Sequence, residues 1–414
     1  MRLFGAVPFS GDVREMNERN ALLPVRMNAL NQRLSLAVEA GVAPGIVAMA
    51  ATPEGMIYEG AAGLTGLESS AAMTPDTIFW ILSMTKAVTA VACMQLVEQG
   101  RLHVDQLASD FIPELAAPQV LEGFSQEGVP LLRPAKRPIT IRHLLTHTSG
   151  YTYSLWSKTL ARYEEVTGTP IVFSGRKEAL SVPLEFDPGE RWQYGMSIEW
   201  VGRLIEIISG QTLEDYFRDN IFTPLGMHDT GFIISDEQRA RTATAAQREN
   251  DGSLTSAPYE SPQQADFALA GTGLFSTPRN YMAFLQMLLN EGSLNDVKIL
   301  EPATVAAMMR NQIGEINVAE MVSPHPARSK NFDLFPDMPH KWGFSFDINT
   351  QPGPYGRSAG SAAWAGAMNT HYWIDPVTKV TGALFTQIWP FYDDQIIALF
   401  NSFEQTLYQG LQSN

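Results

Sequence analysis

The chain has 414 residues, 45% of them hydrophobic and 18% charged, a composition typical of a globular protein that buries a large core. Its formal net charge of −15 argues against a nucleic acid or an anionic membrane surface as a partner. The sequence contains no run of about 18 uncharged apolar residues and no apolar segment near its start, so it predicts neither a membrane-spanning helix nor a signal peptide, and we expect a cytoplasmic protein.

The predicted elements begin with an amphipathic helix. Apolar residues recur at helical spacing over residues 25–40, and Gly41 ends the pattern. Two strands are expected next, over residues 45–51 and 55–61, and a tight Thr-Pro-Glu-Gly turn joins them. The first part of the chain therefore indicates a helix followed by a β-hairpin.

The most informative stretch is Ser83-Met84-Thr85-Lys86, between an apolar run over 78–82 and a long apolar helix predicted over 87–97. Ser83 would stand at the helix N-terminus, where an oxyanion is favoured, with Lys86 one turn on and on the same face. A serine becomes nucleophilic when a neighbour takes its proton, and a lysine whose pKa is lowered by burial can do so. Most matches to this pattern are only capped helix starts with a solvated lysine. A solvated lysine is out of place between two apolar runs.

The middle of the chain is predicted to be mostly helical. Helix-length patterns cover residues 140–146, 160–167, 198–208 and 212–221, and proline-rich connectors separate them. Tyr194 lies on a loop just before the third of these helices, where its phenol could pass a proton between a nucleophile and a leaving group. An aromatic residue at such a position more often serves packing. The pairing with Ser83 and Lys86 favours a catalytic tyrosine.

The C-terminal part mirrors the N-terminal part. Strands are expected over residues 369–374 and 380–388, followed by a closing helix over 393–408. Hairpins at both ends predict an α/β protein with one antiparallel sheet flanked by helices, in a lobe made of residues 1–102 and 226–414. Residues 103–225 would form an inserted, mostly helical lobe, with the active site in the cleft between the lobes. The irregular segment 322–341 could lie over that cleft.

Two further stretches carry a family resemblance: Leu-Leu-Thr-His-Thr-Ser-Gly at 144–150 and Pro-Leu-Gly-Met at 224–227. With Ser83, Lys86 and Tyr194 they resemble the serine β-lactamase and penicillin-binding-protein superfamily. Within it the motifs are most similar to the class C β-lactamase-like esterases (family VIII carboxylesterases), and also to the fungal statin acyltransferase. The resemblance runs from about residue 25 to residue 409. It implies a β-lactamase/transpeptidase-like fold and gives His147 a structural role.

The resemblance also implies an oxyanion hole. The triplet Trp-Ala-Gly at 364–366 lies where β-lactamases carry Lys-Thr-Gly and these esterases carry Trp-Gly-Gly. Carried over, the backbone N–H of Ala367 would join that of Ser83 in binding the oxyanion. A small residue such as Gly366 lets a strand edge approach the substrate closely.

Two departures from the β-lactamase pattern bear on the substrate. Met196 stands where an asparagine is expected two residues after the tyrosine, and Trp364 stands where a lysine would pair with a β-lactam carboxylate. Both are expected to contact the substrate and to make its pocket more apolar. Neutral, hydrophobic esters are therefore the expected substrates.

We accordingly expect a serine carboxylester hydrolase that acts on small to medium hydrophobic esters through a Ser83 acyl-enzyme, with Lys86 and Tyr194 as base and proton relay. Three alternatives stay open: acyl transfer to an alcohol, a β-lactamase or D-amino-acid peptidase, and an inactive binding protein on the same fold. Ser358 matches a nucleophile elbow, but without the strand before it and the helix after it that the elbow needs. The single cysteine, Cys93, and the absence of metal-ligand spacing among the histidines predict no metal and no other cofactor.

Overall fold

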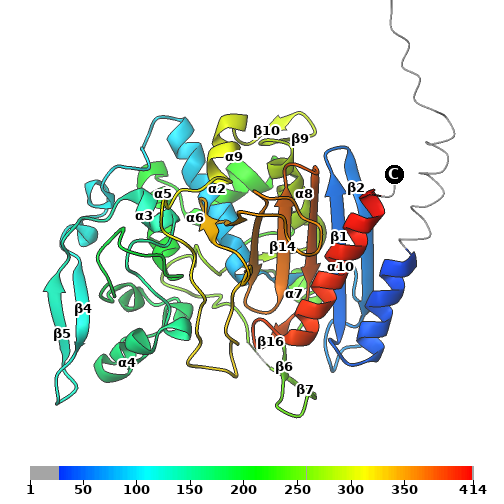
Figure 1. Cartoon of the computed structure of the whole chain (residues 1–414), viewed down its shortest axis with the longest axis horizontal. Helices are drawn as coiled ribbons and strands as arrows, with labels where there is room; N and C mark the ends of the chain where they lie inside the picture. The colour runs from blue at the N-terminus through cyan, green and yellow to red at the C-terminus, as the bar shows by residue number, and fades with distance from the viewer. Residues whose placement is uncertain (1–27, 258, 413–414) are drawn as a thin grey trace, which may run out of the picture.

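A seven-stranded antiparallel sheet, built from both ends of the described chain, lies at the centre of the fold (Figure 1). The computed structural model describes residues 28–257 and 259–412. The strands of the sheet are, in spatial order, β11 (His340–Trp342), β12 (Asp347–Asn349), β13 (Ala362–Gly366), β14 (Thr370–Asp375), β15 (Val380–Phe385), β1 (Gly45–Thr52) and β2 (Gly55–Gly63). Because β1 pairs with β15, the N-terminal hairpin extends the sheet of the C-terminal strands, as the sequence predicts.

The remaining elements are mostly helices and short strand pairs. The helices are α2 (Thr85–Glu98), α3 (Ile141–Leu145), α4 (Lys158–Thr167), α5 (Ser197–Ser209), α6 (Leu213–Phe217), α7 (Asp236–Ala240), α8 (Pro278–Leu289), α9 (Pro302–Met308) and α10 (Asp394–Gln412), and residues 28–39 are also helical. The short strands are β3 (Phe79–Trp80), β4 (Gln119–Phe124), β5 (Pro130–Pro134), β6 (Ala246–Arg248), β7 (Leu254–Ser256), β8 (Phe275–Ser276), β9 (Ser293–Leu294), β10 (Val297–Lys298) and β16 (Ile388–Trp389).

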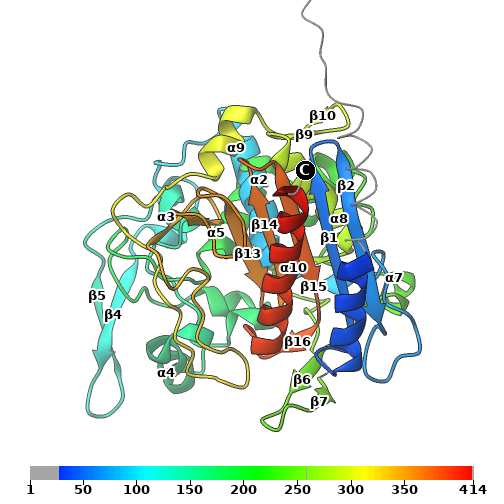
Figure 2. The same cartoon turned by 45° about the vertical axis from the view of Figure 1, so that its right-hand side comes forward.

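Helices cover both faces of the sheet. Successive residues of a strand point to opposite faces, so Ile46 and Ala48 of β1 pack into a core with α10 and the helix of residues 28–39. Figure 2 shows these two helices lying over the sheet. Val47 and Met49 point the other way, into the larger core that contains α2 and α8. This second core extends into the helices of the middle of the chain, and the first residues of α2 lie within it. The mixed α/β architecture expected from the sequence is thus confirmed.

Most predicted elements are present, although their bounds differ in several places. The strand expected over 380–388 ends at Phe385, and Ile388 and Trp389 pair instead with β6 in a separate small sheet. The helix expected over 212–221 is α-helical only to Phe217 and then widens into a π-helical turn up to Phe222. The first three residues of the helix expected over 25–40 lie outside the described part. Among the described residues, no helix has both the length and the hydropathy needed to cross a membrane.

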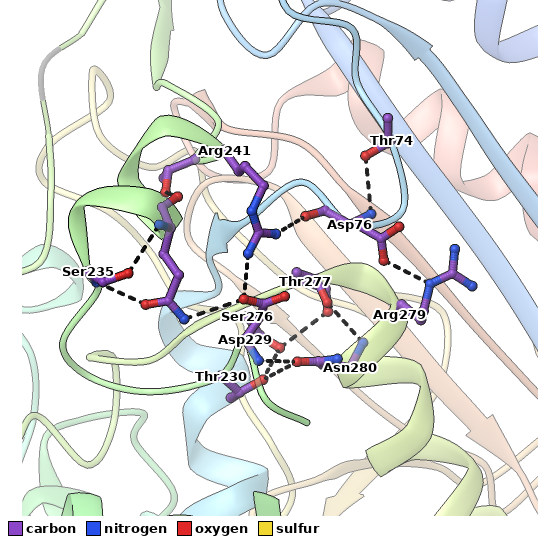
Figure 3. A network of polar contacts seen from close by, with 12 residues as sticks. Thr74, Asp76, Asp229, Thr230, Ser235, Arg241, Ser276, Thr277, Arg279 and Asn280 are labelled. Carbon is purple, nitrogen blue, oxygen red and sulfur yellow. Dashed lines mark hydrogen bonds and ion pairs between the residues drawn. The ribbon is translucent and has the colours of Figure 1, made fainter. Parts of the chain in front are cut away.

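A network of polar contacts fixes the segment that leads into β3 and on to α2 (Figure 3). Arg241 donates to the backbone oxygen of Asp76 at 2.9 Å and to the carboxylate of Asp229 at 2.6 Å. Arg279, in the first turn of α8, donates to the Asp76 carboxylate at 2.8 Å. The amide of Asp229 in turn donates to the Asn280 side chain at 2.9 Å. Three segments distant in the sequence are thereby joined a few residues before Ser83.

Candidate active site

Ser83 and Lys86 meet at the start of α2, as the sequence predicts. Ser83 lies in a short 3₁₀ turn, η1 (Leu82–Met84), that leads directly into α2. The residue before it, Leu82, has a φ of 46°, a left-handed conformation that is strained for a leucine. Lys86 is fully buried, and its Nζ donates to Ser83 Oγ at 3.1 Å and to the carbonyl of Gly271 at 2.8 Å. The two side chains that the sequence predicts as nucleophile and base are therefore in direct hydrogen-bond contact.

The surroundings of Lys86 favour its neutral form. Burial lowers the pKa of Lys86 to about 7, and the charge of Glu199 opposes part of this shift. Lys86 Nζ lies 4.8 Å from the ring centroid of Tyr194 and 5.2 Å from that of Tyr153. A lysine with a pKa near neutrality can accept a proton from a serine at physiological pH, which an ordinary solvated lysine cannot do.

Tyr194 lies on the loop before α5 and is buried against the same cluster. The indole N–H of Trp364 donates to its hydroxyl at 3.1 Å. Burial raises the pKa of Tyr194 above its ordinary value, and hydrogen bonds with Ser83 and Trp364 oppose the rise. The phenol is therefore protonated at neutral pH and reaches both the serine and the indole.

His147 packs behind Tyr194 rather than beside Ser83. Its ring centroid is 4.7 Å from that of Tyr194, and its Nδ1 accepts a hydrogen bond from the backbone N–H of Gly195 at 3.4 Å. Burial lowers the pKa of His147 well below its ordinary value, so the ring is neutral. These contacts fit the supporting role that the family resemblance implies.

Glu199 is a residue of this site that our sequence reasoning missed. It lies in the first turn of α5, it is 1% exposed, and its Oε1 accepts a hydrogen bond from the backbone N–H of Gly271 at 3.1 Å. Its other oxygen, Oε2, is buried without a hydrogen-bond partner. Burial raises the pKa of Glu199 to about 7, and the charge of Lys86 opposes the rise. Gly271 thus contacts both groups, the lysine through its C=O and the carboxylate through its N–H.

A cavity of about 380 Å³ opens beside Ser83. This volume is within the range of small-molecule sites. Its wall is mainly aromatic and aliphatic: Trp80, Leu82, Ser83, Tyr153, Ser154, Leu155, Trp156, Ile171, Phe173, Ser174, Tyr259, Glu260, Thr272, His325, Arg328, Ala367 and Trp389. Ser83 and Ala367, whose N–H groups form the predicted oxyanion hole, share this wall. The segment 322–341 contributes His325 and Arg328, so part of it does border the site.

Three residues that the sequence predicts to contact the substrate are absent from the wall of this cavity as the described residues form it. Trp364 is 3% exposed, and its ring is held between Tyr194 and Trp342, with centroids 4.9 and 4.6 Å away. Met196, 1% exposed, lies at the start of α5 inside the core. A Cβ on Gly366 would lie only 2.4 Å from the backbone oxygen of Ile81, so this glycine lets β13 approach the chain before Ser83 rather than a ligand. Direct substrate contact by these three residues therefore stays a prediction, and the contacts found here are with protein groups.

Ser358 has the environment of a structural serine. Its hydroxyl lies 2.9 Å from that of Thr378, and its backbone N–H donates to Asp375 at 2.8 Å. No strand or helix directly flanks it, because β12 ends at Asn349 and β13 begins at Ala362. Within the described residues, no group of three or more His, Cys, Asp or Glu side chains is placed to hold a metal ion.

Comparison with known proteins agrees with this geometry. Residues 30–404 match the family model described as Beta-lactamase. The chain belongs to this family. It is 30% identical over 394 residues to the lovastatin esterase of Penicillium rubens, covering 90% of this chain and 96% of the relative. It is 31% identical over 350 residues to the monacolin J acid methylbutanoyltransferase of Aspergillus terreus, covering 81% of this chain and 83% of the relative.

Solved structures agree with this placement. A variant of simvastatin synthase from Aspergillus terreus superposes with a TM-score of 0.82 at 28% identity, over 94% of this chain and 98% of that one. EstCE1, described as a hydrolase with promiscuous acyltransferase activity, gives a TM-score of 0.74 at 21% identity over 94% and 99% of the two chains, which shows the fold alone. The protein is therefore a serine hydrolase or acyltransferase with the β-lactamase/transpeptidase-like fold.

Proposed function

We propose that this protein is a serine carboxylesterase that works through a Ser83 acyl-enzyme. The observation that carries the proposal is the 3.1 Å contact between Ser83 Oγ and the Nζ of a fully buried Lys86 whose pKa is about 7, next to a largely apolar cavity. The ester group itself carries no charge, and the transfer of its acyl chain from water into such a cavity is favourable. Small to medium hydrophobic esters are the substrates that this cavity favours.

In the first half of the reaction, Ser83 Oγ attacks the ester carbonyl carbon while its proton passes to Lys86 Nζ. The negative charge that forms on the carbonyl oxygen would be held by the N–H groups of Ser83 and Ala367. The tetrahedral intermediate then collapses, the bond to the alcohol oxygen breaks, and that oxygen takes a proton through Lys86 and Tyr194. The alcohol leaves and the acyl group stays on Ser83.

In the second half, water attacks the acyl carbonyl and loses its proton to the same pair. The bond to Ser83 Oγ breaks, Oγ recovers a proton, and the carboxylic acid leaves. Because the lysine and the tyrosine lie against each other, their protons are coupled, and the formal base is a property of the pair.

Acyl transfer to an alcohol is the second candidate. The same acyl-enzyme serves both reactions, and the named relatives include an esterase and a methylbutanoyltransferase at nearly equal identity. The two differ only in whether water or a bound alcohol takes the acyl group. No specific observation favours a β-lactamase, a D-amino-acid peptidase or an inactive binding protein.

The test is turnover and labelling of matched serine variants. The wild type should hydrolyse p-nitrophenyl butyrate and react with a fluorophosphonate, and Ser83→Ala should lose both properties. Ser358→Ala is the control and should keep both. Label mapped to Ser358, or undiminished turnover in Ser83→Ala, would overturn the proposal. Adding an alcohol acceptor to the assay and quantifying ester against acid separates transfer from hydrolysis.

A further inference from the structure

Arg328 is a cation on the wall of the cavity. It comes from the segment 322–341, and two backbone hydrogen bonds fix its position: its own N–H donates to His325 at 2.8 Å, and Phe391 donates to its carbonyl at 2.9 Å. Its guanidinium carbon lies 4.0 Å from the ring centroid of Tyr259 and 5.8 Å from that of Trp389. Both aromatic residues also line the cavity, so the guanidinium is stacked on its wall.

The guanidinium has no anionic partner among the described residues. Other arginines of the chain pair with carboxylates, for example Arg357 with Glu404 and Arg133 with Asp187. The carboxylate on the same cavity wall, Glu260, is already bound by Arg239 at 2.6 Å. Burial lowers the pKa of Arg328, and no neighbouring carboxylate counteracts that shift. An arginine stays charged in proteins, so Arg328 brings a positive charge without an ion-pair partner to the cavity wall.

An unpaired guanidinium in an aromatic cavity is suited to a carboxylate. The planar fork of donors matches the two oxygens of that group, and a partly buried pair is screened less by salt than an exposed one. The whole protein has a formal charge of −15 and repels anions at long range. A preference for an anionic substrate would therefore have to come from a local cation, and Arg328 is the arginine on this wall.

We propose that the preferred esters carry a carboxylate at a distance from the scissile bond, and that Arg328 binds this carboxylate. The inference rests on the proposed function, because it describes the substrate of the Ser83 site. It narrows the substrate class from hydrophobic esters to amphipathic ones, with an apolar body along the aromatic wall and an anionic end at Arg328.

The test compares matched pairs of charged and neutral esters. On the acyl side the probes are the mono-p-nitrophenyl esters of adipic, suberic and sebacic acids, each beside its methyl-capped counterpart. On the alcohol side the probes are 4-(butyryloxy)benzoate and its methyl ester. Each is assayed with the wild type, Arg328→Gln, Arg328→Lys and Lys330→Gln. Lys330 is the matched control, since it lies on the same segment and pairs with Asp394 outside the cavity.

The wild type should favour a carboxylate ester over its methyl-capped counterpart, with an optimum at one chain length because the cation is fixed. Arg328→Gln should lower kcat/KM for that ester about tenfold to a hundredfold, mainly through KM, which is the usual effect of losing a charged hydrogen bond. Its kcat/KM for the neutral counterparts should change by less than about threefold. Arg328→Lys should keep part of the preference for the carboxylate ester over its methyl-capped counterpart. Lys330→Gln should keep the whole of this preference.

Equal effects of Arg328→Gln on charged and neutral esters in both series would overturn the inference and leave the proposed function intact. A wild type that prefers the methyl-capped ester at every length would do the same. Failure of the wild type to turn over any ester of either series would instead overturn the proposed function.

Discussion

Replacing Glu199 with glutamine should move the acid limb of the pH–rate profile to lower pH. The carboxylate is buried close to Lys86, and its negative charge favours the protonated lysine. Glutamine has the same shape, and its side-chain oxygen can still accept the hydrogen bond from Gly271. The substitution therefore removes the charge with little change in packing. Since the base must be neutral to act, Lys86 in the variant should stay active at a pH at which the wild-type lysine is already protonated.

The size of the shift follows from the distance between the two groups. Glu199 Oε1 and Lys86 Nζ lie 2.6 Å and 3.1 Å from the point where a Cβ on Gly271 would stand, so they are at most about 6 Å apart. At that separation and an effective dielectric constant of about 20, a unit charge pair is worth about 3 kcal/mol, or roughly two pH units. The pKa of Glu199 is itself about 7, so the carboxylate is partly protonated over the relevant range. A downward shift of about one to two pH units is expected.

The assay is kcat/KM for p-nitrophenyl butyrate between pH 5 and pH 9. The wild type should lose activity as the pH falls through about 7, where Lys86 takes up its proton. Glu206→Gln is the matched control, because Glu206 lies on the same helix but pairs with Arg203 away from the lysine. An acid limb of Glu199→Gln that coincides with the wild type, or moves to higher pH, would refute the electrostatic coupling.

Three further predictions concern catalysis, packing and stability. Lys86→Met and Tyr194→Phe should each fold and lose about a hundredfold or more in kcat/KM for p-nitrophenyl butyrate, and near-normal rates would remove that residue from the mechanism. Gly366→Ala should lower stability by about 1–3 kcal/mol in chemical denaturation, since its Cβ would lie 2.4 Å from the Ile81 oxygen, and an unchanged midpoint would contradict this packing. His340, buried between Asp333 and Asp347, has its pKa raised to about 9, so its stabilising charge is complete below about pH 6.5 and is lost as the pH rises through about 9. The stability difference between the wild type and His340→Gln should therefore be larger at pH 6 than at pH 10, and equal differences would exclude this linkage.

The sequence predicts the parts of the site that depend on local spacing. Ser83 and Lys86 are three residues apart on one helix face, so their contact follows once a helix is predicted there. The antiparallel sheet also follows from local patterns, because each hairpin carries its own turn. Glu199 carried no such local signal: with Arg203 and Glu206 it falls at positions i, i+4 and i+7 of α5, a spacing typical of one polar helix face, and only the structure shows that Glu199 is buried.

What the sequence could not give is the direction in which side chains point. Family resemblance predicts Trp364 at the substrate, but it could not indicate that the indole donates a hydrogen bond to Tyr194. The cavity wall comes instead from segments far apart in the chain, such as Tyr153, Tyr259 and Trp389. Their meeting depends on long-range packing that no local pattern encodes. The division of the chain at residues 102 and 226 stays a prediction.

At Lys86, the interactions that would stabilise the folded protein most are not those that keep the lysine neutral. Burying an ammonium group is costly, and at Lys86 the cost is offset only in part, by hydrogen bonds to Ser83 and Gly271 and by the charge of Glu199. A closer carboxylate would stabilise the fold further, but it would also raise the pKa of the lysine and keep it protonated at neutral pH. A more distant one would leave the charge uncompensated. The carboxylate instead accepts the N–H of Gly271 while the lysine donates to the C=O of the same residue, so the glycine holds the two charges near each other without a direct ion pair. That spacing keeps the lysine both buried and able to lose its proton, which is the state that serine activation needs.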